Sequence, residues 1–321
     1  MSTGTGNNRT AFDGFREEFR MAWQTFPDKA LFFVLLAAWV ALFQWLGNST
    51  FGYVASPSIF AWMNGAYDRP GSDDAHGYLI PVVVLVLFWR NRQALLAIPK
   101  AGWWPGLGLF AAALGLHVIG YLVQQPRVSI VAMFAGVYAL LAAVWGWRFA
   151  RACFFPFCLF VFCIPISTLA EPITIPLRQI ATDIAVAVSH KALGIPVVQQ
   201  GVQIIDPRGS YQYEVAAACS GIRSTIALLA LTTIYGWVSF TSLWKRLLMM
   251  ALAMPLALAS NVLRLVAIIV AAEAFGRGAG EVVHNWFGFV SFALAIGAVL
   301  GVGHWLRDAP PTVGVLAPKT A

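Results

Sequence analysis

Residues 247–272 read LLMMALAMPLALASNVLRLVAIIVAA, and this stretch decides the class of fold. It is long enough to cross a membrane as one helix, which takes about 20 apolar residues. Its single charged side chain is Arg264, in the outer half, and Asn261 lies three residues earlier on the same helical face. An ionisable residue inside a span is costly, so the two residues predict a polar stripe directed at the protein interior.

Seven further apolar runs are of the same kind, and together the eight predict an all-α polytopic membrane protein. The expected spans lie near 30–48, 78–91, 105–123, 128–147, 153–170, 221–240, 247–272 and 285–305. The second run is the weakest, because its uncharged stretch is short and contains Pro81. Counts of seven or nine spans therefore stay open.

Composition and charge agree with a membrane protein. Hydrophobic residues make up 59% of the 321 residues and charged residues 11%, whereas an average soluble domain has about 45–50% and about 25%. This excludes soluble globules, secreted disulfide scaffolds and DNA-binding proteins. The +7 net charge is spread over the ends of the apolar runs. Most Lys and Arg fall in segments that are inner when the N-terminus is inside, so both ends are expected in the cytoplasm.

The expected organisation is a cytoplasmic N-terminal segment (1–29), a single transmembrane domain (30–305) and a cytoplasmic tail (306–321). The one long external segment is 171–220, and within it residues 177–193 predict a helix lying in the membrane interface. Its two faces are expected to be apolar (Leu177, Ile180, Ile184, Val188) and polar (Gln179, Thr182, Asp183, His190). Strands at 197–205 and 211–215 flank Asp206-Pro207-Arg208-Gly209, which predicts a β-hairpin leading to Cys219.

Cys219 lies in EVAAACSGIRS (residues 214–224), at the N-terminal edge of the sixth span. A helix N-terminus and a cation such as Arg223, four residues on, stabilise a thiolate. The small neighbouring residues leave room for another chain to approach the sulfur. The alternative is a buried small hydrophobe, the usual state of a free Cys, and this is what we expect of the other three: Cys153, Cys158 and Cys163.

His284 begins the eighth span on the outer side, and Gly288 lies one turn later, where it allows close approach of a helix or a substrate. Taken singly, His284 has the alternative of a solvated interfacial residue. Arg264 has the alternative of a structural Arg that snorkels outward or binds backbone carbonyls. The topology nevertheless places Cys219, Arg264 and His284 at the same outer leaflet. They are the parts of a cysteine acyl-transfer site: a nucleophile, a cation for the thiolate or oxyanion, and a proton donor.

Other intramembrane peptidase patterns are missing from the sequence. It has no Gly-x-Ser-x-Gly, no His-Glu-x-x-His and no Gly-x-Gly-Asp motif. Its His residues have no Cys or carboxylate partners at ligand spacing, so neither a metal nor another cofactor is expected.

The sequence resembles the exosortase/archaeosortase family at four short motifs, in the family's order and with its eight-span layout. They are the His76-Gly77 segment (75–81), Ala217-Ala218-Cys219-Ser220-Gly221-Ile222-Arg223-Ser224, Asn261-Val262-Leu263-Arg264 and His284-x-x-x-Gly288-x-x-x-Phe292. The resemblance implies that Cys219, Arg264 and His284 are catalytic. His284 stands where archaeal relatives tend to have Arg, which points to the bacterial branch. Supporting or substrate-binding roles are expected for His76, Arg223, Asn261 and Gly288.

The resemblance also implies a multi-pass enzyme of the bacterial inner membrane with an external active site. Its substrates would be secreted proteins with a C-terminal tail: a Pro-Glu-Pro-type motif, one transmembrane helix and a basic cluster. The family often accompanies exopolysaccharide production. The expected partners are therefore such proteins and membrane lipid, with no nucleic acid, whereas the cleavage motif, the acceptor nucleophile and the oligomeric state stay open.

Two functions of other classes stay open beside this one. A transporter or flippase for a polysaccharide or a lipid-linked precursor would use Arg264 and Asn261 to bind an anionic substrate within the spans. A non-catalytic assembly scaffold would tolerate replacement of Cys219, Arg264 and His284 alike.

Overall fold

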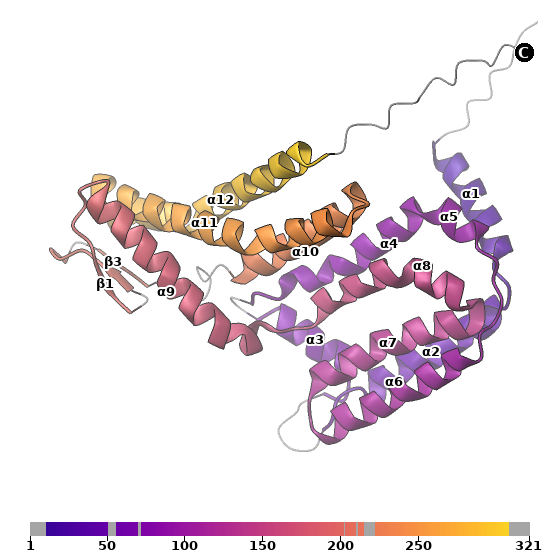
Figure 1. The fold of residues 1–321 in the computed structure, drawn as a ribbon. Coiled ribbons are helices and arrows are strands. Elements are labelled where there is room, and N and C mark those ends of the chain that lie inside the picture. The colour runs from indigo at the N-terminus through magenta and orange to yellow at the C-terminus, as the bar shows by residue number, and fades with distance from the viewer. Residues whose placement is uncertain are drawn as a thin grey trace, which may run out of the picture. The chain divides into compact units, whose positions relative to one another are not determined.

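The protein is described by a computed structural model over residues 11–50, 56–69, 72–201, 203–209, 211–214 and 222–307. Most of these residues are helical, which confirms the expected all-α membrane fold (Figure 1). The chain divides between Ile166 and Ser167 into two compact units, unit 1 before this point and unit 2 after it. Each unit is described by itself.

Unit 1 consists of helices and short 3₁₀ turns. In chain order these are α1 (Ala11–Thr25), α2 (Lys29–Leu46), α3 (Ile59–Tyr67), η1 (Ala75–Tyr78), α4 (Ile80–Arg90), α5 (Arg92–Ala97), α6 (Pro105–Leu122), α7 (Pro126–Trp145), α8 (Trp147–Cys158) and η2 (Leu159–Cys163). Helices α6 and α7 pack as a hairpin, and α2 packs on α7. The Trp39 indole of α2 donates to the Met133 carbonyl (2.9 Å) and covers Gly136, where a Cβ would meet the ring at 2.2 Å.

In its described residues, unit 2 combines four helices with a small sheet. Its elements are α9 (Ser167–Lys191), β1 (Val198–Gln200), β2 (Gln203–Ile205), β3 (Gln212–Glu214), α10 (Ile222–Ser239), α11 (Leu243–Phe275) and α12 (Arg277–Trp305). Helices α11 and α12 reverse at Gly276 (φ 84°) and pack along each other, with α9 and α10 also packed on α11. The buried face of α12 is a stripe of small residues broken by one Val: Gly280, Ser291, Ala295, Val299 and Gly303. Small residues let membrane helices approach closely.

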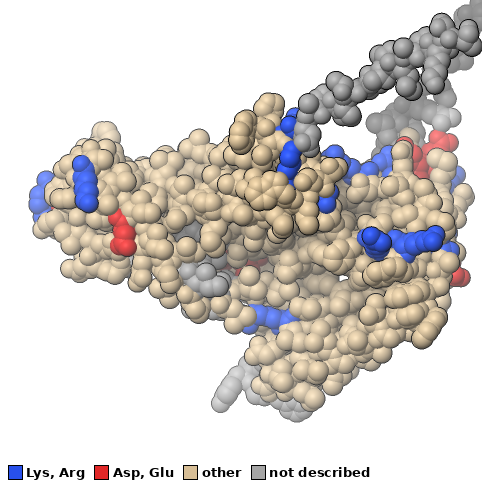
Figure 2. Space-filling model, viewed as in Figure 1, with Lys and Arg blue, Asp and Glu red and all other residues tan. Residues whose placement is uncertain are grey.

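Five of the described helices are long and apolar enough to cross a membrane: α2, α6, α7, α11 and α12. The expected spans near 78–91 and 221–240 are shorter apolar helices. The expected span at 153–170 is wrong as one helix, because η2 ends at Cys163 and Ile164 is extended (ψ 119°). Ile164 precedes Pro165, and a residue before proline is disfavoured in helical conformation. The face in Figure 2 is mostly neutral, as expected of a surface in contact with lipid.

Helix α9 begins ten residues earlier than the expected helix at 177–193, and its packing differs from the expectation. Among the α9 residues whose side chains the structure describes, the buried ones are small: Ala181, Thr182, Ala185 and Ser189. Ala181 and Ala185 pack in one cluster with Leu265 and Ile269 of α11. The larger side chains Ile180, Ile184 and Val188 are exposed. Thr182, on the expected polar face, is buried. Small side chains allow α9 to lie close to α11, so the face with Ala181, Thr182 and Ala185 packs inward instead of the large apolar one.

The strands of unit 2 form a three-stranded antiparallel sheet in the order β1-β2-β3 instead of a single hairpin. The expected long strand at 197–205 folds back at Gly201, whose φ is +64°, and Ile204 then pairs with both Gln199 and Tyr213. The turn at 206–209 is confirmed, since the Gly209 amide donates to the Asp206 carbonyl (2.9 Å). The sheet therefore leads the chain to Glu214 and to the segment that contains Cys219.

Candidate functional site

Helices α11 and α12 bring two of the three expected catalytic residues together. Arg264 of α11 is partly buried, and its Nη2 donates a hydrogen bond of 2.7 Å to the backbone carbonyl of His284 in α12. This is the carbonyl contact that a structural Arg would also make. A guanidinium has five N–H donors in a planar fork, so the bond to His284 accounts for one of them.

Gly288 explains how Arg264 reaches that carbonyl. Gly288 lies four residues after His284, so in a helix its amide faces the His284 carbonyl and any side chain at 288 would stand beside it. A Cβ at Gly288 would lie 3.4 Å from Cζ and 3.5 Å from Nη1 of Arg264. The guanidinium therefore packs against Gly288 at van der Waals distance, and the close approach at Gly288 is made by Arg264.

Asn261 lies one turn before Arg264 and is buried, with 7% of its surface exposed. Its neighbour Ser260 is also buried. The predicted polar stripe on α11 therefore faces the interior of unit 2 at Asn261 and continues to Arg264 at the contact with α12. A polar side chain is retained in an apolar helix interface at a cost, which is typical of a functional position.

The small sheet is fixed on α11 close to Arg264. Arg208, in the β2–β3 turn, donates to both carboxylate oxygens of Glu273 (2.6 and 2.7 Å) and to the buried Asp206 (3.3 Å). Tyr211 packs with Leu265, Ile269 and Ala272, and burial raises the pKa of its phenol to about 12. This contact was not predicted from the sequence. Its sequence signal is an acidic residue near the end of α11 together with an Arg in the predicted turn at 206–209.

Cys219 lies outside the described residues, and so does the side chain of Arg223. The structure does place both ends of the segment 215–221 that contains Cys219. One end follows β3, which unit 2 fixes on α11 through Tyr211. The other end precedes α10, which connects to α11 through residues 240–242. Such a short connection makes the helices antiparallel neighbours.

In an antiparallel pair of helices, residues at equal distances in sequence from the connection lie side by side. This relation gives the position of the start of α10 along α11. The first residue of α10, Ile222, then lies level with Ser260, and Leu228 packs in one cluster with Ala253 and Ala257. Ser260 is one helical turn, about 6 Å, from Arg264. Along α11, Arg264 therefore lies between the level of Ile222 and the residues that pack with Tyr211.

His76 belongs to unit 1, so its expected role beside Cys219, Arg264 and His284 stays a prediction. Its Nδ1 lies 3.1 Å from the Asp73 carbonyl oxygen, which makes Nδ1 the protonated nitrogen of the neutral ring. Burial lowers the pKa of His76, partly offset by that carbonyl, so the ring is neutral near pH 7. The neighbouring Asp74 accepts a bond from the Ile166 amide (3.1 Å) and so fixes the end of unit 1.

Gly77→Ala is expected to destabilise unit 1. A Cβ at Gly77 would lie 2.6 Å from Cζ of Tyr67, whose hydroxyl donates to the Cys163 carbonyl, so the ring and this bond must shift. Overpacking of this kind costs about 1–3 kcal/mol. Thermal unfolding of the detergent-solubilised protein should show a lower midpoint. Gly65→Ala, with open space around its Cβ, is the control and should not lower it; equal midpoints for both variants would contradict the packing described.

Comparison with known proteins gives one match. A family model described as transmembrane exosortase matches residues 62–301, well over half of the chain. The comparisons with curated proteins and with solved structures find no match. The matched range includes η1 with His76, the Cys219 segment, and both helices of the Arg264–His284 contact. The chain therefore belongs to the transmembrane exosortase family.

Proposed function

We propose that this protein is a membrane cysteine peptidase or transpeptidase that cleaves secreted proteins near a C-terminal sorting tail. Family membership supports a protein-sorting activity in the membrane. The observation that carries the specific proposal is the contact of Arg264 with His284. Along α11, Arg264 lies between the level of Ile222, which follows the Cys219 segment, and the residues that pack with Tyr211, which precedes it. The tail would have a Pro-Glu-Pro-type motif, a transmembrane helix and a basic cluster, and the active site would face the outside.

The chemistry assigned to the three residues is acyl transfer. The Cys219 thiolate attacks the scissile carbonyl carbon, and Arg264 stabilises first the thiolate and then the oxyanion. His284, which has taken the proton of the Cys219 thiol, gives it to the leaving amine nitrogen as the C–N bond breaks, and this leaves a Cys219 thioester. An acceptor, either water or an amine, then loses a proton to His284, attacks the thioester carbonyl and releases the thiolate.

A thioester is a direct test of this proposal. Membranes with this protein are mixed with a tagged reporter that carries the tail, quenched in acid and separated under denaturing conditions without thiols. We expect a covalent adduct of protein and reporter that neutral hydroxylamine cleaves, since hydroxylamine attacks thioesters. A reporter without the tail is the control. Reporter processing without any hydroxylamine-sensitive adduct, even after rapid quenching, would contradict the acyl-enzyme.

Gly288→Val is expected to slow reporter processing on the order of tenfold to 100-fold, because misplacing a catalytic group by about 1 Å costs this much. A Cβ at residue 288 would already be in van der Waals contact with the Arg264 guanidinium. The two methyl groups of valine extend beyond it, and we expect them to displace the guanidinium from the His284 carbonyl. Gly297→Val is the matched control on α12, since a Cβ at Gly297 meets nothing within 4 Å. Rates are compared at equal membrane levels. Equal rates for the two variants would show that Arg264 need not occupy this position.

A further inference from the structure

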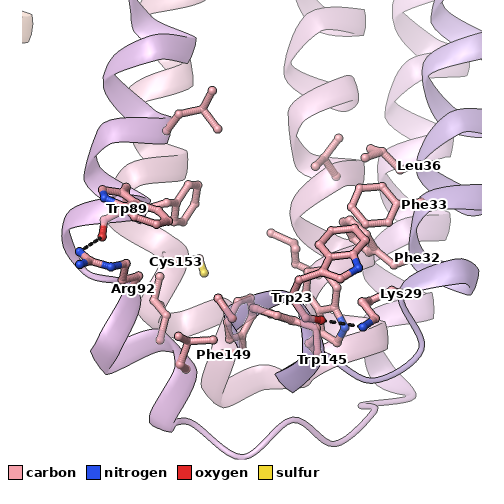
Figure 3. Close-up of a pocket in the computed structure, with 18 of the residues that line it drawn as sticks. Trp23, Lys29, Phe32, Phe33, Leu36, Trp89, Arg92, Trp145, Phe149 and Cys153 are labelled. Carbon is pink, nitrogen blue, oxygen red and sulfur yellow. Dashed lines mark hydrogen bonds between the residues drawn. The ribbon is translucent and has the colours of Figure 1, made fainter. Parts of the chain in front are cut away.

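Unit 1 contains an apolar cavity of about 510 Å³, far along the chain from the proposed catalytic residues. This volume is within the range of ~300–1,000 Å³ that is typical of ligand sites. Its walls come mainly from α1, α2, α4, α5, α7 and α8, and half of the lining residues are Phe or Trp. Figure 3 shows Trp89 and Arg92 on one side, Trp23 and Lys29 on the other, and Cys153 between them.

Two cations are the charged members of this lining, among the residues that the structure describes: Lys29 and Arg92. The Lys29 ammonium donates to the Trp23 carbonyl (2.6 Å) and lies 5.3 Å from the Trp23 ring centroid. Arg92 lies over the Trp89 ring (4.5 Å) and donates through Nε to Glu18 of α1 (2.8 Å). An ammonium has three donors, so the bond from Lys29 to Trp23 accounts for one. The cavity thus combines an apolar interior with a cation that can bind an anion.

The position of the two cations in the fold indicates the depth of the cavity in the membrane. Lys29 is the first residue of α2, one of the helices long enough to span, and Arg92 follows the end of α4. Basic residues at the ends of spans lie at the level of the lipid headgroups. Helix α1 contributes Phe19 and Trp23 to the cavity, while its Arg16, Glu17 and Arg20 are exposed. A short helix with such faces is typical of the membrane interface.

We propose that this cavity is a binding site for an anionic glycerophospholipid. One acyl chain lies among the aromatic side chains of α1, α2, α7 and α8, and the phosphate meets Lys29. Charge complementarity favours an anionic lipid over a zwitterionic one, because the Lys29 ammonium lies beside the apolar lining, whereas Arg92 is already paired with Glu18. The positive-inside orientation would place this lipid in the cytoplasmic leaflet, where anionic headgroups are available.

Native mass spectrometry of the full-length, detergent-purified protein tests this proposal. Phosphatidylglycerol and phosphatidylcholine with identical acyl chains are added at equal concentrations. We expect one phosphatidylglycerol to be retained, about tenfold in preference to phosphatidylcholine, which corresponds to about 1.4 kcal/mol. Lys29→Gln should remove most of this preference. Arg148→Gln, an exposed basic residue outside the cavity, is the matched charge control and should keep it.

A second variant separates the cavity from simple surface attraction. Leu36→Trp places a bulky ring at the wall of the cavity and should lower retention of both lipids at unchanged charge. If Leu36→Trp does not fold, Leu85→Trp fills the cavity from a position that is 67% exposed and therefore tolerant. Equal retention of the two lipids by the wild-type protein would overturn the proposal. Unchanged phosphatidylglycerol retention in the folded filling variant would overturn it as well.

Discussion

A reporter with the sorting tail is expected to accumulate uncleaved in cells that produce the Cys219→Ala variant. Removing the nucleophile of a protease lowers turnover by a factor on the order of 10⁶, so no product should be detected. The expectation follows from the assigned chemistry, because alanine offers no atom that could form the acyl-enzyme. Processing is measured by the gel shift of the reporter and by its release from the membrane.

Cys158→Ala is the matched control for the Cys219 variant. Cys158 is exposed on α8 and lies in unit 1, so its removal deletes a thiol without opening a cavity in the core. Full processing is expected with Cys158→Ala when both variants reach the membrane in equal amounts. Normal processing by Cys219→Ala would remove the thiol mechanism and would favour a transporter or a scaffold instead.

Much of the helical layout could be predicted because lipid imposes a simple rule on sequence. Every backbone polar group must be satisfied within a span, so long apolar runs are read directly as helices. This rule predicted α2, α6, α7, α11 and α12 to within a few residues at most ends. It also drew attention to Arg264 and Asn261, since a polar residue in such a run requires an explanation.

The differences from the prediction occur where hydropathy carries no information. The break at Ile164 depends on the local backbone restriction imposed by Pro165. The packing of α9 through Ala181 and Ala185 depends on which face can approach α11, and in lipid a large apolar face has no preference for the interior. The expectation that Cys158 is buried is wrong, since it is exposed. In lipid an apolar side chain has no preference for the protein interior.

At the candidate site, the sequence identified Arg264 and His284 but not the atoms through which they meet. The shared outer location was inferred from basic-residue counts, and the structure adds a bond from the guanidinium to the His284 backbone. Any residue type at position 284 would offer the same backbone carbonyl, so this bond cannot be predicted from the residue found there. The sequence signal is at Gly288 instead, where the guanidinium lies at van der Waals distance from a Cβ and a larger side chain would crowd it.

Arg264→Lys is expected to lower the rate of reporter processing about 10²- to 10³-fold, the usual effect of losing one oxyanion donor. Lysine keeps the positive charge, so an effect of this size would come from the shape of the guanidinium. A planar fork can hold the His284 carbonyl with one N–H while others face a substrate oxygen, whereas an ammonium is a point charge on a flexible stem. Single-turnover rates, measured at saturating reporter, separate this loss from weaker substrate binding.

Arg246→Lys is the control that distinguishes a catalytic role of Arg264 from a structural one. Arg246, also on α11, donates through Nε to the Phe240 carbonyl (2.8 Å) and lies over the Trp237 ring (3.9 Å). Like Arg264, it therefore donates to a backbone carbonyl, but it lies near the opposite end of the helix. If both residues only support the fold, the two lysine variants should lower the unfolding temperature and the processing rate together. If Arg264 stabilises the oxyanion, Arg264→Lys should slow processing far more than its change in unfolding temperature explains, and Arg246→Lys should not. The reason is that the interaction lost in Arg264→Lys exists in the transition state and not in the resting protein.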